Sequence, residues 1–350
     1  MKATRRSSRP EEGQTATRYD PRRMIVISIG CPASVGPEVS LAAVRRLQDA
    51  GCVLVGSALA IRQAAELVRV PMRRLEPYAG QVLRPGRLYI LDVGPELAAR
   101  DLDPRRPTRA SGRSQLAAID AAFDLVRRTP RAALVTGPVS KALIARSGAT
   151  GADVFKGHTE WLQARDGAPS AIMCFASPRL TTSLASTHLP LARVPGWLTP
   201  GHVAEATVQL ALFLRALGNE RPRLAVCSLN PHAGESELLG DEERRAIVPG
   251  IALARRRLRG KATLTGPVGA ESAYRLAYAG AYDGVVAMYH DQATIPTKLV
   301  AFGDAVNVTL GLSRVRTSVD HGTAYDIAWQ GKADASGMRA AVKLAQRLVH

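Results

Sequence analysis

Short apolar runs alternate with segments of helical spacing from residue 24 onward. In the first part of the chain, apolar runs predict buried strands at 24–29, 52–55, 88–92 and 133–136. Between them, apolar residues recur three and four positions apart, which predicts helices over 38–49, 58–68 and 113–128. The later part repeats the pattern, with strands near 171–176, 181–187, 223–228 and 284–288 and helices near 202–217, 241–258 and 335–348. Strands that alternate with helices indicate βαβ units and a mainly parallel sheet covered on both faces.

The length of 350 residues is enough for two domains that each bury a core. We therefore expect an α/β protein of two α/β/α domains, with a ligand cleft between the domains or at the carboxyl ends of the strands. No stretch approaches the roughly 18–20 apolar residues that span a bilayer, so we expect no membrane partner. Residues 1–23 are polar, with seven basic and three acidic groups, and predict a disordered basic extension rather than a signal peptide.

The chain has 47 basic and 30 acidic residues, which gives a formal charge of +17. This surplus is compatible with a nucleic-acid partner, with an anionic substrate, or with no specific partner. Forty of the basic residues are arginines, dispersed in pairs such as Arg45-Arg46 and Arg127-Arg128, and aromatic residues make up only 5 % of the chain. Dispersed charge with few aromatic residues favours solvated helix faces, and we expect no nucleic-acid partner.

The four cysteines form no CxxC pair and no zinc-finger spacing. They are typical of reduced, mostly buried thiols, and predict a cytoplasmic protein.

Three of the seven histidines, His188, His232 and His290, each follow an apolar run that predicts a strand. Because residues just past the ends of parallel strands lie at one edge of the sheet, these side chains could converge. Three neutral imidazoles suit a catalytic divalent metal that keeps one coordination position open for substrate. The alternative is that each is a hydrogen-bonded structural histidine, since the sequence has no local ligand pair such as HExxH.

Two segments could bind an anion. The first is the Gly/Pro-rich turn at 30–38, where Pro37 suits an early helical position and the helix N-terminus could hold a phosphate. It matches neither GxGxxG nor GxxxxGK[ST], so a purely structural turn is the alternative. The second comprises Lys298, Asn307 and Arg316, whose cations and amide suit a phosphate or carboxylate unless they are ordinary surface groups.

Together, the motifs of the chain resemble the 4-hydroxythreonine-4-phosphate dehydrogenase family of pyridoxal phosphate biosynthesis. The resemblance covers residues 24 to 345. The matching text is GxPAxxGPE at 30–38, TGPV with the following lysine at 136–141, GHTE at 157–160, THLPL at 187–191, LNPHAGE at 229–235, AMYHDQ at 287–292, NVTLGL at 307–312 and RTSVDHGTAYDIA at 316–328.

The resemblance implies an oxidoreductase that acts on a CH–OH group with NAD(P). In the family, 4-phosphohydroxy-L-threonine is oxidised to 2-amino-3-oxo-4-phosphooxybutanoate, which decarboxylates to 3-amino-2-oxopropyl phosphate. One divalent metal per site (zinc, magnesium or cobalt) is implied at the three histidines that match, and these act in catalysis through the metal. The implied metal ligands are His188, His232 and His290, and the implied substrate residues are His158, Thr159, Lys298, Asn307 and Arg316. Members are homodimers whose active site lies at the subunit interface, with metal ligands from both chains.

Residues 321–328 also resemble the nucleotide-binding loop of the isocitrate and isopropylmalate dehydrogenases. That likeness implies cofactor contacts from His321, Gly322, Thr323, Asp326 and Ile327. An acidic residue in this loop favours NAD, because a carboxylate bonds ribose hydroxyls and repels the extra phosphate of NADP. The likeness further implies a two-domain fold with a cleft between domains. We expect 24–138 plus 300–350 in the first domain, and 139–299 in a second domain with the metal histidines and dimer contacts.

Several positions depart from the usual text of the family. The departures are Cys31 at a commonly acidic position, Ser34 for glycine, Ser236-Glu237-Leu238 for Gly-Gly-His, Glu271 for aspartate, Ala293-Thr294 for Gly-Leu, and Trp329 at a usual glycine. None is a matched metal or substrate residue. The substrate within the family stays open, with threonate or erythronate 4-phosphate and a dihydrodiol dicarboxylate as alternatives. An inactive small-molecule-binding relative is the alternative from a different functional class.

Overall fold

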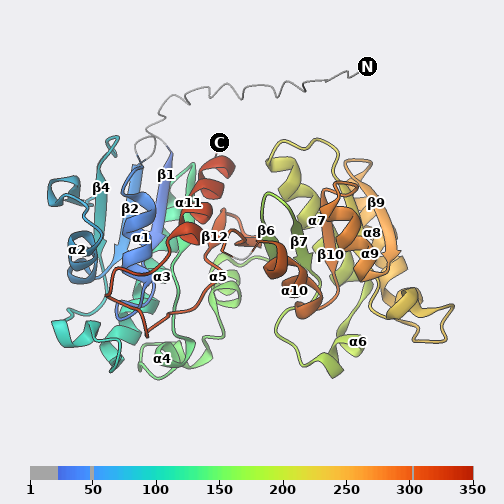
Figure 1. Ribbon diagram of the computed structural model, residues 1–350, viewed down its shortest axis with the longest axis horizontal. Helices are drawn as coiled ribbons and strands as arrows, with labels where there is room; N and C mark the ends of the chain where they lie inside the picture. The colour runs from blue at the N-terminus through green and yellow to red at the C-terminus, as the bar shows by residue number, and fades with distance from the viewer. Residues whose placement is uncertain (1–22, 48–50, 302, 350) are drawn as a thin grey trace, which may run out of the picture.

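The strands form one mixed sheet. The computed structural model describes residues 23–47, 51–301 and 303–349, so nearly all of the predicted extension at 1–23 lies outside the described residues (Figure 1). The strands are β1 Met24–Ser28, β2 Gly51–Gly56, β3 Leu75–Pro77, β4 Leu88–Asp92, β5 Ala132–Thr136, β6 Ile172–Ala176, β7 Thr181–Leu184, β8 Arg223–Cys227, β9 Thr263–Val268, β10 Gly284–Ala287, β11 Val306–Leu310 and β12 Arg316–Ser318. Their order in the sheet is β3-β4-β2-β1-β5-β12-β11-β6-β7-β10-β8-β9.

Helices cover this sheet. They are α1 Gly36–Val44, α2 Ala58–Leu67, α3 Arg109–Arg128, α4 Lys141–Ala145, α5 His158–Asp166, α6 Val194–Trp197, α7 Pro200–Ala216, α8 Val248–Leu258, α9 Ala270–Tyr278, α10 His290–Ala301 and α11 Ser336–Leu348. Two short turns matter for the site: η5 Pro231–Gly234 and the π-helical turn η6 Glu243–Ile247.

Most neighbouring strands are parallel, which confirms the prediction of a mainly parallel sheet. The exceptions lie in the middle, where β11 pairs antiparallel with both β12 and β6, and β6 pairs antiparallel with β7. In Figure 1, β1, β2 and β4 lie in the left half of the molecule, and β7, β9 and β10 lie in the right half. The central strands β12, β11 and β6 connect the two halves through backbone hydrogen bonds.

The strands bury side chains on both faces. In β1, Ile25 and Ile27 pack in one core with residues of α1, α2 and α11, whereas Val26 packs in a second core with residues of α3 and α5. In β8, Val226 faces a core with residues of α7 and α8, and Cys227 faces one with residues of α9. Because consecutive residues of a strand point to opposite faces, this alternation produces helix, sheet and helix layers.

Some elements differ from the sequence prediction. The first predicted helix, 38–49, ends at Val44 and is followed by a turn, and 48–50 lie outside the described residues. The predicted helix at 241–258 begins with the π turn η6, and α8 follows it. Pro249 lies in the first turn of α8 and has no N–H to donate to the preceding turn. The four strands β3, β9, β11 and β12 and the helices α4, α5, α6, α9 and α10 were not predicted.

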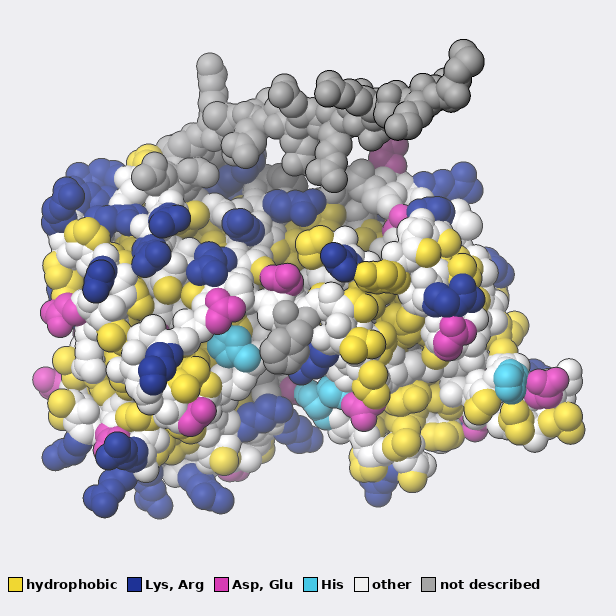
Figure 2. All heavy atoms as spheres, in the orientation of Figure 1, with side chains coloured by type: hydrophobic (Ala, Val, Ile, Leu, Met, Phe, Trp, Pro, Cys, Tyr) yellow, Lys and Arg dark blue, Asp and Glu magenta, His cyan; other side chains and the backbone are white. Residues whose placement is uncertain are grey.

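The distribution of charge on the surface and the burial of the cysteines agree with what the sequence predicts. Figure 2 shows Lys and Arg side chains spread over the visible face and interspersed with acidic ones, rather than gathered in one patch. Within the part of the chain that the structure describes, no helix is both long enough and apolar enough to cross a membrane. All four cysteines are free and buried, as predicted. Burial raises the pKa of the Cys52 and Cys227 thiols to about 12.

Candidate active site

A cavity of about 190 Å³ opens at the middle of the sheet, where side chains from both halves meet. Its polar lining includes most of the residues that the sequence assigned to substrate. The lining residues are Gly137, Pro138, Val139, Lys141, Gly157, His158, Thr159, Glu160, Met173, His188, Asn307, Arg316, Ser318, Val319 and His321. Of the predicted substrate residues, only Lys298 is not on this wall.

The guanidinium of Arg316 is buried, and no carboxylate among the described residues forms an ion pair with it. The residue is only 3 % exposed, because β12 lies between β5 and β11. Its Nη2 and Nε donate to the hydroxyl of Thr136 at 2.7 and 3.2 Å, and its Nη1 donates to the hydroxyl of Thr309 at 2.8 Å. Burial lowers the pKa of Arg316 to about 9, while the charge of Glu160 raises it. A buried cation whose partners are neutral hydroxyls is typical of a site that receives an anion.

Two of the predicted substrate residues on the cavity wall have buried polar atoms without hydrogen-bond partners in the described structure: His158 Nε2 and Asn307 Oδ1. Glu160 Oε2, on the same wall, is a third buried atom of this kind. Burial lowers the pKa of His158 well below its usual value, and the charges of Arg316 and Lys141 lower it further. His158 is therefore neutral at neutral pH. Because buried polar atoms are normally hydrogen-bonded, the atoms of His158 and Asn307 are available to a bound molecule.

His188 and His290 lie next to each other, with ring centroids 5.8 Å apart. They follow β7 and β10, which are neighbouring parallel strands, as the sequence predicted. Each Nδ1 faces a carboxylate: His188 Nδ1 lies 3.5 Å from Glu160 Oε1, and His290 Nδ1 lies 2.7 Å from Asp291 Oδ1. The contact with His188 is the main reason why the pKa of Glu160 is lowered. A carboxylate on Nδ1 orients an imidazole to bind a metal through Nε2, so these two residues fit a divalent cation.

His232 does not join this pair within one chain. It follows β8, which also neighbours β10, but the chain passes through η5 with left-handed backbone at His232 (φ 51°) and Ala233 (φ 54°). No group of three metal-ligating side chains occurs among the described residues. One chain therefore brings together two of the three histidines that the sequence grouped.

The predicted cofactor residues lie beside the cavity rather than in it. Only His321 reaches the lining, and its Nδ1 lies 3.0 Å from the carbonyl oxygen of Gly322. Asp326 is exposed, and Ile327 packs against the hydrophobic core. Next to this segment, Lys298 Nζ lies 3.4 Å from Asp320 Oδ2. Burial raises the pKa of Asp320, and the charge of Lys298 opposes this.

The Gly/Pro turn at 30–38 contacts the predicted cofactor segment at 321–328. The N–H of Val35 donates to the carbonyl oxygen of Thr323 at 3.1 Å, and the N–H of Gly36 donates to the Ser34 hydroxyl at 3.0 Å. Cys31 Sγ lies 3.4 Å from Tyr325 Oη. Protein groups thus occupy these N–H donors at the start of α1, which favours the structural alternative for the turn over an anion site.

Sequence reasoning did not assign roles to four polar residues of the site: Thr136, Lys141, Glu160 and Asp291. Asp291 could have been found, since it directly follows a candidate metal histidine. Glu160 and Thr136 act on His188 and Arg316, which are distant in the sequence, so no local signal identifies them. Lys141 belongs to a matching motif, and only the fold places it on the cavity wall.

The fold and this cavity place the chain among α/β enzymes that bind small anionic substrates near the ends of parallel strands. The family model described as Pyridoxal phosphate biosynthetic protein PdxA matches residues 48–345, and the chain belongs to this family. A relative from Desulfosudis oleivorans, named 4-hydroxythreonine-4-phosphate dehydrogenase, is 38 % identical over 93 % of this chain and 96 % of its own length. A D-threonate 4-phosphate dehydrogenase from Salmonella typhimurium is 35 % identical over 93 % of this chain and 99 % of its own.

Solved structures agree. The crystal structure of 4-hydroxythreonine-4-phosphate dehydrogenase from Klebsiella pneumoniae is similar, with a TM-score of 0.78 and 33 % identity. The match covers 94 % of this chain and 100 % of that one. The similarity therefore extends over the whole fold described above.

Proposed function

We propose that this chain oxidises the hydroxyl-bearing carbon of 4-phosphohydroxy-L-threonine with NAD. The product, 2-amino-3-oxo-4-phosphooxybutanoate, then loses carbon dioxide to give 3-amino-2-oxopropyl phosphate. The names of the relatives support the reaction. The observation that carries the proposal is the buried guanidinium of Arg316, which has hydroxyl partners but no anionic one among the described residues.

The side chains of the cavity would bind and orient this substrate. Arg316 retains N–H donors for the phosphate or carboxylate, and charge-assisted hydrogen bonds of this kind are short and directional. Neutral His158 and Asn307 offer their unpartnered atoms to the polar groups of the substrate. Holding the anionic end fixes the position of the hydroxyl-bearing carbon, which lowers the entropic part of the barrier.

The metal and cofactor would lie on either side of the cavity. His188 and His290, with Glu160 and Asp291 on their Nδ1 atoms, would hold a divalent cation (zinc, magnesium or cobalt) together with His232. When bound, the cation supplies Lewis-acid chemistry at the substrate oxygen and the nicotinamide supplies the hydride acceptor. The residues at 321–327 would hold the dinucleotide, with the exposed carboxylate of Asp326 available to ribose hydroxyls, which favours NAD over NADP.

The cation site would be completed by a second copy of the chain. Large apolar side chains are exposed beside each histidine segment: Leu191 (65 %), Leu238 (81 %) and Leu299 (83 %). Apolar side chains this exposed near an incomplete site support an interface between copies. We further infer two domains in the arrangement of isocitrate and isopropylmalate dehydrogenases, with the cavity in the cleft between them. The four buried free thiols support a cytoplasmic location.

The test is NADH formation by the full-length protein with 4-phosphohydroxy-L-threonine. Parallel reactions use D-threonate 4-phosphate, erythronate 4-phosphate and a dihydrodiol dicarboxylate, each with metal-depleted protein and after a divalent cation is restored. We expect the highest kcat/KM for 4-phosphohydroxy-L-threonine, and only with the cation. A higher value for a sugar-acid phosphate would overturn the substrate, and no NADH from any of them would overturn the reaction.

A further inference from the structure

Two buried glutamates outside the cavity each accept hydrogen bonds from the backbone of an active-site loop. Glu38 in α1 is 2 % exposed, and Glu243 at the start of η6 is 6 % exposed. Carboxylates are rarely buried this completely unless a specific partner compensates the lost hydration. In both cases the partners include two backbone N–H groups of a loop.

Glu38 holds the end of the predicted cofactor segment. Its Oε1 accepts a hydrogen bond from the N–H of Trp329, and its Oε2 accepts one from the N–H of Gly331 at 3.1 Å. Trp329 has left-handed backbone (φ 62°), which is unfavourable for a bulky residue and needs support from its surroundings. Burial raises the pKa of Glu38, while these two N–H groups lower it. The contact between Val35 and Thr323 fixes the other end of the same segment.

Glu243 holds the loop that contains His232. Its Oε1 accepts hydrogen bonds from the N–H groups of Leu229 and Asn230 at 2.8 and 2.9 Å, and its Oε2 accepts one from the Asn230 side chain at 3.0 Å. A Cβ placed on Gly234 would lie only 2.9 Å from Glu243 Oε2. The carboxylate therefore lies between the start and the end of η5, so it sets the path of the chain through His232.

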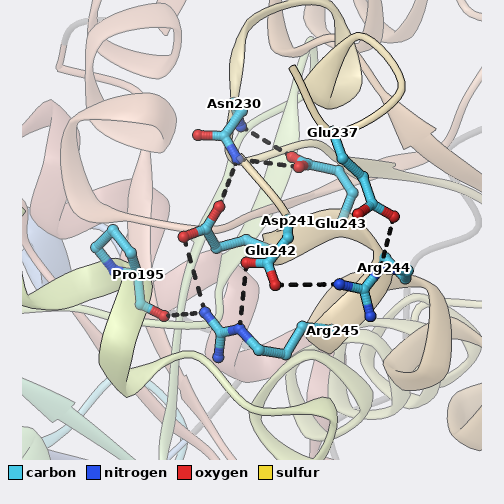
Figure 3. Close-up of polar contacts among 8 residues, drawn as sticks. All are labelled: Pro195, Asn230, Glu237, Asp241, Glu242, Glu243, Arg244 and Arg245. Carbon is cyan, nitrogen blue, oxygen red and sulfur yellow. Dashed lines mark hydrogen bonds and ion pairs between the residues drawn. The ribbon is translucent and has the colours of Figure 1, made fainter. Parts of the chain in front are cut away.

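The ion pairs next to Glu243, in contrast, are formed by solvent-exposed arginines. Figure 3 shows Arg244 directed to Glu237 and Asp241, and Arg245 directed to Asp241, Glu242 and the carbonyl of Pro195. The side chains of Arg244 and Glu237 are 63 % and 49 % exposed. Exposed ion pairs contribute little, so Glu237 offers a matched control in the same loop.

We propose that Glu38 and Glu243 are positioning residues for separate loops, so that Glu38 sets the affinity for NAD and Glu243 sets the affinity for the divalent cation. This inference rests on the proposed roles of residues 321–327 and of His232. A loop that is already ordered loses less entropy when its ligand binds, and a group that orients a metal ligand raises metal affinity. Neither glutamate touches the cavity, so neither is itself a catalytic residue.

The experiment measures two affinities in the full-length protein. Metal-depleted protein is titrated with cobalt(II) chloride by calorimetry, and NADH binding is followed by its fluorescence. Glu38→Gln is expected to weaken NADH binding roughly tenfold and to leave cobalt binding unchanged. Glu243→Gln is expected to weaken cobalt binding about 10–100-fold and to leave NADH binding unchanged. The controls Glu66→Gln, on the exposed side of α2, and Glu237→Gln should change neither.

A second pair of variants disturbs the same loops directly. Gly331 has left-handed backbone (φ 68°), which alanine disfavours, and a Cβ on Gly234 would collide with Glu243 Oε2. Gly331→Ala should reproduce the loss of NADH affinity, and Gly234→Ala the loss of cobalt affinity, even if a glutamate variant fails to fold. The inference is overturned if a single glutamate variant weakens both NADH and cobalt binding, or if neither affinity changes in the glutamate and glycine variants. It is also overturned if the control variants lose the same affinities. Wild-type protein that binds neither cobalt nor NADH would overturn the proposed function as well.

Discussion

Replacing Arg316 with methionine should leave the stability of the ligand-free protein nearly unchanged while removing its capacity to bind a phosphorylated substrate. Methionine has a side chain of similar length but brings no charge. The two effects differ because the hydrogen-bond partners of this guanidinium among the described residues are hydroxyls, which compensate its burial only in part. Buried charges that are not paired can be replaced by apolar groups at no cost or with a gain in stability.

The size of the effect follows from the pKa of Arg316. Burial lowers it from 12.5 to about 9, which corresponds to about 5 kcal/mol of unfavourable burial of the charge. Methionine also removes three hydrogen bonds to Thr136 and Thr309, each worth about 1.5 kcal/mol because the donor is charged. The two contributions nearly cancel, so the Tm of the ligand-free protein should stay within about 2 °C of the wild type.

The assay is differential scanning calorimetry of the metal-depleted protein with and without inorganic phosphate. Phosphate should raise the Tm of the wild type and leave that of Arg316→Met unchanged. The control is Arg165→Met, because Arg165 has carboxylate partners in Asp120 at 3.4 Å and Asp124 at 3.1 Å, and its loss should lower the Tm. If Arg316→Met lowers the Tm of the free protein by several degrees, Arg316 is a structural residue and the reasoning is refuted.

Three further predictions concern protonation, metal binding and assembly. Because His158 has a folded pKa well below 6.5, the unfolded chain binds more protons, and this contribution to stability is present above pH 6.5 and lost as the pH falls. His158→Gln should therefore lose less stability than wild type in chemical denaturation between about pH 7 and pH 5, and an equal loss would contradict the shift. Asp291→Asn should weaken cobalt binding by His290 about 10–100-fold in a calorimetric titration with an unchanged melting curve, and an unchanged affinity would exclude Asp291 as its orienting group. Leu238→Asp should give monomers in light scattering where wild type gives dimers, whereas a dimer in both would place the interface elsewhere.

The sequence predicted the fold where apolar periodicity is strong. The strands around β1, β2, β4 and β5 and the long helices α3, α7 and α11 lie where the pattern placed them. Of the central strands, β6 was predicted but β11 and β12 were not, and β12 has only three residues, one of them the charged Arg316. The helix α10 was also missed, since it begins directly at His290 and contains Pro296. In these places tertiary packing, not local propensity, decides the structure.

The candidate site was predictable only in part, because motifs identify residues but contacts between distant segments decide their environment. Motifs with a fixed order identified His158, Asn307 and Arg316, and the fold places all three on one cavity wall. The sequence could not show that Arg316 is buried, since one side of its environment comes from β5, where Thr136 is 180 residues away in the chain. Nor could it show that His232 stays apart from His188 and His290, because that depends on the left-handed turns of η5.

The sheet order has a consequence for how the chain is made. β11 and β12 lie between β5 and β6, yet they are the last strands in the sequence. During synthesis, β1–β5 and β6–β10 can each form first, and until residue 318 emerges β5 and β6 remain open edges that invite pairing with other chains. A polypeptide that stops before β11 would therefore be prone to aggregate. Closing these edges also brings Asn307 and Arg316 into place, so the two halves are joined and the wall of the cavity is completed in the same late folding step.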